Sequence, residues 1–214
     1  MRSFRRLEGL YLVVSSILPL DELLLATEKA LRGGVDILQL IAGPETSEML
    51  AFARGLLDLA RKHKTPLLVN GSLRLVKEID ADGVHFDNYE TTPSQVKQTL
   101  GRKCIVGYTL SNDTQRLRWA EEAGADYVSF CSVFPTCTAN QCQIVPLETI
   151  RTARSRTSLP IFAAGGINLE NAHLVLEAGV DGIAVTSALL KAKDPEQTAI
   201  SLKKIIRNYR RNIS

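Results

Sequence analysis

Two strand-to-helix junctions in the C-terminal part of the sequence carry residues suited to bind an anion. The apolar run Pro160–Ala164 stops at a pair of glycines, and the run Gly182–Thr186 leads into a helix that a Thr-Ser pair opens. Helix N-termini offer N–H groups and a partial positive charge, and glycines let an anion approach the main chain. The predicted phosphate-binding residues are Gly165, Gly166, Thr186 and Ser187. The alternative is that the two glycines serve only a tight turn.

Other polar residues come where further apolar runs end. They are Gln39 with Ile41, Asn70 with Gly71, His85 with Asp87, Asn88 and Glu90, Thr109 with Ser111, and Cys131 and Ser132 with Thr136 and Thr138. In a parallel barrel all strands end at one face, and active sites lie at that face. The sequence therefore predicts one polar, weakly charged pocket.

One of these strand ends combines a histidine with two carboxylates, His85, Asp87 and Glu90. A cluster of this type is able to bind a metal ion, but three residues on one loop lack a convincing spacing for ligands of a divalent cation. The other interpretation is that His85 is a structural histidine held by hydrogen bonds.

The elements that must position these residues alternate along the whole sequence. The predicted strands are Leu10–Val14, Asp36–Ile41, Pro66–Asn70, Asp82–Phe86, Lys103–Tyr108, Asp126–Val133, Pro160–Ala164 and Gly182–Thr186. The predicted helices are Asp21–Arg32, Ser47–Lys62, Leu73–Glu78, Pro93–Thr99, Thr114–Ala123, Leu147–Arg156, Leu169–Glu177 and Pro195–Arg210. This alternation predicts an α/β protein, a single (β/α)8 TIM barrel that forms one domain over residues 1–214. A doubly wound open sheet is the rival, but no dinucleotide-binding fingerprint marks its switch point.

A short repeat supports the barrel. One cassette, in which an Asp follows a helix end and precedes a strand, occurs four times, as GGVDIL, DADGVHF, AGADYV and AGVDGIAV. The cassettes precede the second, fourth, sixth and eighth predicted strands. The repeating unit is therefore a quarter of a barrel, with two strands and two helices.

Composition and charge exclude several classes of protein. No apolar run approaches the length of a membrane span, and the N-terminal segment lacks the cleavage site of a signal peptide. A net charge of +3 is too small to indicate nucleic-acid binding. Four cysteines without regular spacing indicate free thiols in a reducing cytoplasm. The oligomeric state is left open, a homo-oligomer included.

Several stretches in this order resemble the thiamine phosphate synthase/TenI superfamily. They are YLVVS, DILQL, LLVN, ADGVHF, IVGYTLSND, ADYVSFCSVFPTCT, FAAGGIN and AGVDGIAVTSAL, which together cover nearly the whole chain. The resemblance implies the barrel and a phosphorylated small-molecule ligand. Thiamine phosphate synthases join a thiazole monophosphate to an aminomethylpyrimidine diphosphate with the help of magnesium, whereas TenI proteins tautomerise a thiazole phosphate.

The resemblance also implies a role for particular residues. The thiazole phosphate would contact the strand-six threonines, a glycine after strand seven and the amides after strand eight, while the pyrimidine would contact a glutamine. The matching positions are Thr136 and Thr138, Gly165 or Gly166, Thr186 and Ser187, and Gln39, together with Asn70 as the pocket asparagine and Thr109 in place of a serine.

The diphosphate half departs from the family pattern. Both cations of the QLRxK motif are missing, because Ile41 and Gly43 take their places, and Gly71 replaces a magnesium-binding Asp. Glu90 stands at the second carboxylate position, and Ala139 replaces a lysine. The resemblance therefore implies a weakened Mg²⁺ site. Arg74 is the nearest candidate to compensate for the missing cations and Asp87 for the missing metal ligand. The alternative is that Arg74 is a surface arginine without such a role.

Three functions follow from this reading. The first is a divergent synthase-like protein that binds a phosphorylated heterocycle with its diphosphate site eroded. The second is a metal-independent TenI-like tautomerase or isomerase, although Ser132 occupies the place of the histidine on strand six. Serine is a poor general acid or base without a partner. The third is a non-enzymatic phosphate-ligand sensor or carrier.

Overall fold

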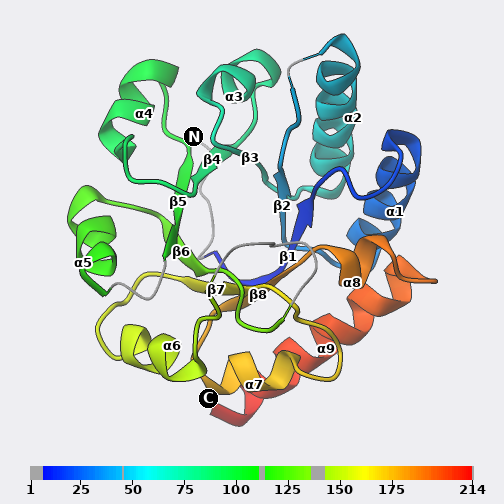
Figure 1. Cartoon of the computed structure of the whole chain (residues 1–214). Coiled ribbons are helices and arrows are strands. Elements are labelled where there is room, and N and C mark those ends of the chain that lie inside the picture. Colours follow the sequence, from blue (N-terminus) through cyan, green and yellow to red (C-terminus); the bar gives the residue numbers. More distant parts are fainter. Residues whose placement is uncertain (1–6, 45, 111–113, 136–142, 214) are drawn as a thin grey trace.

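Eight short strands, all parallel to their neighbours, run through the part of the chain that the computed structural model describes, residues 7–44, 46–110, 114–135 and 143–213. They are β1 (Gly9–Val14), β2 (Ile37–Leu40), β3 (Leu67–Asn70), β4 (Gly83–Phe86), β5 (Ile105–Leu110), β6 (Tyr127–Phe130), β7 (Ile161–Ala164) and β8 (Gly182–Val185). Each strand pairs with the next, and β8 pairs with β1, where Gly9 lies opposite Gly182. The sheet therefore closes, and the predicted (β/α)8 barrel is confirmed (Figure 1).

Helices surround this barrel (Figure 1). They are α1 (Leu20–Arg32), α2 (Ser47–His63), α3 (Leu73–Ile79), α4 (Pro93–Leu100), α5 (Thr114–Ala123), α6 (Leu147–Arg154), α7 (Ala172–Glu177), α8 (Ser187–Leu190) and α9 (Pro195–Ile213). The last helix, α9, packs beside α1, as the sequence predicts for the final helix of a barrel. None of the helices in the described ranges is long and apolar enough to cross a bilayer.

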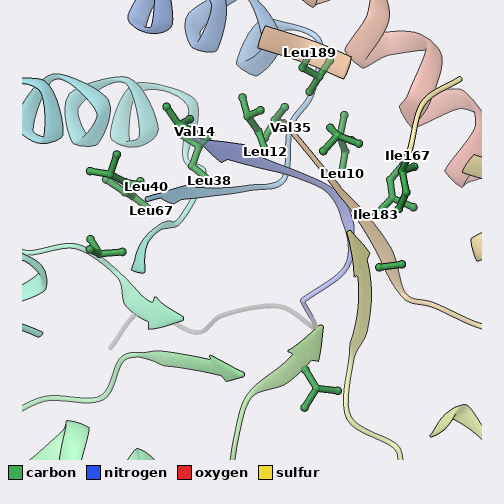
Figure 2. Close-up of a cluster of buried hydrophobic side chains, with 14 of the residues drawn as sticks. Leu10, Leu12, Val14, Val35, Leu38, Leu40, Leu67, Ile167, Ile183 and Leu189 are labelled. Atoms are coloured by element: carbon green, nitrogen blue, oxygen red, sulfur yellow. The ribbon is translucent and has the colours of Figure 1, made fainter. Parts of the chain in front are cut away.

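Each strand is buried on both faces. Leu10, Leu12 and Val14 of β1 belong to the large hydrophobic cluster between the strands and the helices (Figure 2). Tyr11, which lies between them in sequence, belongs instead to a small inner cluster that also contains Tyr127 and fills the barrel. Successive side chains of a strand point to opposite faces, so both faces of this strand require large residues.

The inner cluster is built around Tyr127. A Cβ at Gly107 would lie only 2.1 Å from Cε1 of Tyr127, so glycine on the neighbouring strand makes room for the phenol ring. Tyr11 and Phe162 meet the Tyr127 ring edge-on, with interplanar angles of 62° and 80°. This geometry is one that aromatic pairs favour, and it fixes Tyr127 in the middle of the barrel.

The four repeated Asp residues hold the N-terminal ends of the strands together. The backbone N–H of Asp82 donates to the carbonyl of Leu67 at 2.8 Å, and the Asp82 carboxylate accepts the Leu67 N–H at 3.0 Å. The same reciprocal pair joins Asp36 to Leu10, Asp126 to Val106 and Asp181 to Ile161. Each cassette therefore connects an even-numbered strand to the odd-numbered strand before it, which gives the sequence repeat a physical cause.

Three element boundaries differ from the prediction by three residues, one of them the end of α9, which lies at Ile213 instead of Arg210. Helix α7 begins at Ala172 instead of Leu169, because the Asn168 side chain accepts the Glu170 N–H at 2.8 Å and the Asn171 side chain accepts the Asn168 N–H at 2.9 Å. These bonds form a turn that delays the helix. Strand β6 ends at Phe130, since Ser132 has a φ of +61° that no extended strand accepts.

Replacing the buried Asp82 with Ala should lower the free energy of unfolding by about 1.5–3 kcal/mol, because the buried Leu67 N–H loses its charged acceptor. Urea denaturation of the variant and of the wild type measures the difference. Asp58→Ala, at an exposed position of α2, is the matched control and should change stability by no more than about 0.5 kcal/mol. An equal, small effect at both positions would contradict the role of the repeated Asp.

Candidate functional site

The C-terminal ends of the strands surround a cavity of about 990 Å³, which is large enough for a small-molecule ligand. Most of the predicted site residues line it. These are Gln39, Asn70, Thr109, Gly165, Gly166, Thr186 and Ser187. The fold thus brings both predicted groups, the junction residues and the polar strand ends, to one space. Thr136 and Thr138 lie outside the residues that the structure describes.

The glycine pair after β7 packs tightly against the chain after β6. Gly165 and Gly166 have φ values of +94° and +66°, which side chains disfavour. A Cβ at Gly165 would lie 2.5 Å from the Ser132 backbone, and one at Gly166 would lie 2.6 Å from the Pro135 carbonyl oxygen. Packing therefore requires glycine at both positions, whatever binds beside them.

The second junction begins the short helix α8 beside the cavity. The carbonyl of Thr186 accepts the N–H groups of Leu189 and Leu190 at 3.1 and 2.9 Å, so Thr186 is the residue at which the helix starts. Thr186, Ser187 and Ala188 all line the cavity. Ser187 and Ala188 lie too early in α8 to find an acceptor within the helix, so their N–H groups are the donors that this junction presents at the cavity wall.

On the other side of the barrel, polar side chains are linked in a chain. The Tyr11 hydroxyl donates to Oε1 of Gln39 at 2.7 Å, and Nε2 of Gln39 donates to Oδ1 of Asn70 at 2.8 Å. Nδ2 of Asn70 donates to Oδ2 of Asp87 at 2.9 Å, and the Thr109 hydroxyl donates to Oδ1 of Asp87 at 2.7 Å. Both oxygens of the Asp87 carboxylate therefore accept a hydrogen bond from the protein.

His85 closes this chain into a ring. Its Nε2 lies 2.8 Å from the Thr109 hydroxyl, and its Nδ1 lies 2.7 Å from the hydroxyl of Tyr127. The hydroxyls of Tyr127 and Tyr11 are 2.9 Å apart. We call the complete set the polar ring: Tyr11, Gln39, Asn70, Asp87, Thr109, His85 and Tyr127.

Burial controls the protonation of the deepest members of the polar ring. His85 is only 3% exposed, and this burial lowers its pKa to about 4, although the nearby Asp87 carboxylate acts in the opposite direction. The imidazole is therefore neutral at pH 7. Burial also raises the pKa of Tyr11 and of Tyr127 above the usual value for a phenol, so both keep their protons.

The residues expected to hold or replace the magnesium site do not gather in the cavity. Glu90 is exposed and Arg74 is exposed on α3, and neither is part of the cavity wall, whereas Asp87 is. Across the described ranges, no three His, Cys, Asp or Glu residues are grouped so that they could hold a metal ion. Gly71 has no side chain to act as a ligand, so Asp87 is the carboxylate that the described residues bring to the cavity wall.

Several residues of the cavity wall were not predicted, among them Tyr11, Ser129 and Arg116. Tyr11 and Ser129 lie on strands covered on both faces, where the absence of alternation hides which face a side chain occupies. Arg116 lies on α5 with its guanidinium 4.7 Å from the centre of the Tyr89 ring, and it brings a positive charge to the cavity. No motif in the sequence marks this position.

Comparisons with known proteins agree with the geometry. The family model for thiamine monophosphate synthase matches residues 10–189. A thiamine-phosphate synthase from Methylococcus capsulatus is 38% identical over 197 residues, which cover 91% of this chain and 88% of that protein. One from Nitrosococcus oceani is 35% identical over 199 residues, 92% of each chain.

A solved structure is similar over the same length. The thiamine phosphate pyrophosphorylase from Pyrococcus furiosus matches with a TM-score of 0.81 and 30% sequence identity, and the match covers 94% of this chain and 96% of that one. The likeness therefore extends over the whole barrel.

The buried His85 should make stability fall in acid. Its folded pKa of about 4 lies below the unfolded value of 6.5, so the unfolded chain takes up a proton that the native protein resists. The stabilisation is complete above about pH 6.5 and declines as the pH falls toward 4, by up to roughly 3 kcal/mol. Urea denaturation at a series of pH values measures this decline.

The variant His85→Gln should show a smaller loss of stability between those pH values than the wild type. His173→Gln, at an exposed position of α7, removes a histidine elsewhere and should keep the wild-type decline. A decline that is unchanged in His85→Gln would show that other groups cause it.

Proposed function

The chain belongs to the thiamine monophosphate synthase family, and from that premise we propose that it binds a thiazole phosphate or a similar phosphorylated heterocycle in the cavity. One observation carries the proposal: the two strand-to-helix junctions that suit an anion and the polar residues at the other strand ends line the same cavity. A role in thiamine biosynthesis follows from the family.

The phosphate belongs at the junctions after β7 and β8. The first turn of α8 supplies backbone donors beside Ser187, and Gly165 and Gly166 expose main chain in the same wall. Main-chain donors suit a phosphate dianion because they need no cationic side chain. Barrels of this class commonly bind phosphate after their last two strands.

The heterocycle belongs at the opposite wall. Gln39, Asn70 and Thr109 come from β2, β3 and β5, and all three reach the cavity. These strands lie around β4, which is four strands from β8 in a closed barrel of eight. A ligand with its phosphate at β8 therefore points its other end toward this group. We therefore assign these three residues to ring recognition.

Synthase activity on the usual diphosphate substrate should be weak. A diphosphate leaving group needs cations as its bond breaks, but Ile41 and Gly43 replace two of them and Gly71 replaces a magnesium ligand. Each charge-assisted contact contributes roughly 1.5–3 kcal/mol, so three losses cost on the order of 5–9 kcal/mol. That corresponds to roughly three to six decades in rate.

A metal-independent tautomerase or isomerase is the second candidate function. The specific observation in its favour is that a carboxylate, Asp87, and an imidazole, His85, reach the cavity and are linked through the Thr109 hydroxyl. Turnover of thiazole phosphate and pyrimidine diphosphate with magnesium would separate the synthase from the other candidates, whereas binding without turnover would support a non-enzymatic sensor or carrier.

Calorimetric titration with thiazole phosphate should give saturable binding that is lost with the unphosphorylated thiazole alcohol. Ser187→Asp should weaken binding by about tenfold or more, because it places a negative charge against the phosphate. Ser187→Ala keeps the backbone donors and should cost only about 1 kcal/mol, roughly fivefold.

Ser94→Asp is the matched control, since it adds the same charge to the first turn of α4, away from the cavity wall. It should bind like the wild type. Equal affinity in Ser187→Asp and Ser94→Asp, with both variants folded by circular dichroism, would place the phosphate elsewhere and remove the main support for the proposal.

A further inference from the structure

The polar ring contains more contacts at hydrogen-bond distance than its side chains have hydrogens to fill. When Asp87 is ionised, both of its oxygens can only accept, so the Thr109 hydroxyl must donate to it. The same hydroxyl then accepts from His85, which places the imidazole hydrogen on Nε2. Nδ1 of His85 is left as an acceptor, and the Tyr127 hydroxyl must donate to it.

The other half of the ring runs in the opposite direction. Asn70 donates to Asp87, Gln39 donates to Asn70, and the Tyr11 hydroxyl therefore donates to Gln39. Both phenol hydrogens are now used, that of Tyr11 toward Gln39 and that of Tyr127 toward His85. The contact of 2.9 Å between the hydroxyl oxygens of Tyr11 and Tyr127 has no hydrogen left.

One added proton removes this deficit. If Asp87 carries a hydrogen, it donates to Thr109, Thr109 donates to Nε2 of His85, and Nδ1–H of His85 donates to Tyr127. Tyr127 then donates to Tyr11, and each contact of the ring holds one hydrogen. The imidazole stays neutral throughout and only changes tautomer, which agrees with its deep burial.

We propose that the polar ring is a proton site of the cavity, which takes up one proton through Asp87 and returns it by reversing the direction of its hydrogen bonds. Asp87 is the suitable entry point, because its side chain is 64% exposed and lines the cavity, whereas His85 is buried behind it. A ligand that gives a proton to Asp87 completes the ring, and the same proton returns to another ligand atom. The site therefore suits a metal-free proton shift on a bound ligand. This exchange with a ligand rests on the proposed function of the cavity, whereas the hydrogen count of the polar ring does not.

The surroundings supply few other charges. The ionisable groups that interact with Asp87 are His85, Tyr127 and Tyr11. Arg116 of α5 and Cys131 after β6 lie in the cavity wall, and the Tyr89 hydroxyl donates to the Thr109 carbonyl. The remaining strands contribute side chains that do not titrate: Gln39, Asn70, Thr109, Ser129 and Phe162. Among the described residues of the cavity wall, Asp87 is the carboxylate.

Nitrogen NMR of the histidine side chains tests the ring directly and needs no ligand. At about pH 7 the wild type should show His85 as the pure Nε2–H tautomer, because only that tautomer fits an ionised Asp87. Asp87→Asn supplies the missing hydrogen from an amide. The amide oxygen accepts from Asn70 as the carboxylate does, and the amide N–H donates to Thr109, so Nε2 of His85 becomes an acceptor. The preference for Nε2–H should therefore be lost, and the signals of the two nitrogens should move toward each other.

Lowering the pH of the wild type should produce the same convergence before the signature of an imidazolium. Tyr11→Phe removes the contact between hydroxyls that lacks a hydrogen, without changing Asp87 or His85, so the convergence in this variant should be shifted to lower pH. Asn88→Asp, next to Asp87 but outside the ring, adds a carboxylate and should leave the wild-type tautomer at about pH 7.

A mixed or Nδ1–H tautomer in the wild type at about pH 7 would overturn the inference, as would a pure Nε2–H tautomer in Asp87→Asn. Neither result depends on thiazole phosphate. Failure to bind that compound would contradict the proposed function, while the tautomers would still report whether the ring holds a proton.

Discussion

A buried phenol must find a partner for its hydroxyl group, and in this barrel that requirement connects the core to the site. The ring of Tyr127 fills the interior over Gly107, so its hydroxyl lies among other side chains and away from bulk solvent. Tyr11 and His85 supply the contacts. The polar ring thus lies where the inner hydrophobic cluster meets the cavity, and the packing of that cluster holds Tyr11 and Tyr127 in place.

The two ends of the barrel carry different tasks. At the N-terminal ends of the strands, Asp82 and its three counterparts connect the backbones of neighbouring strands. At the C-terminal ends, polar side chains such as Gln39 and Asn70 face a cavity. This separation is general in barrels of this class, because loops at one end are free to vary while the other end maintains the fold.

The walls of the cavity differ in charge. One wall offers backbone donors near Ser187, and the opposite wall offers the Asp87 carboxylate within a neutral hydrogen-bonded ring. A carboxylate repels a second anionic group and attracts hydrogen-bond donors. This distribution of charge is consistent with the proposed ligand, which has a phosphate at one end and a heterocycle at the other.

The sequence by itself determined the order of strands and helices, the fourfold Asp cassette, and the strand ends at which polar residues occur. These features depend on local patterns, such as an apolar run followed by Gly165, and local patterns are visible in a sequence. Only the tertiary structure decided which side chains face inward. Strands covered on both faces show no alternation, so nothing in the sequence separates Tyr11 from its outward neighbours. The polar ring could not be predicted either, because side chains such as Tyr127 and His85 lie on different strands and meet only in the folded barrel.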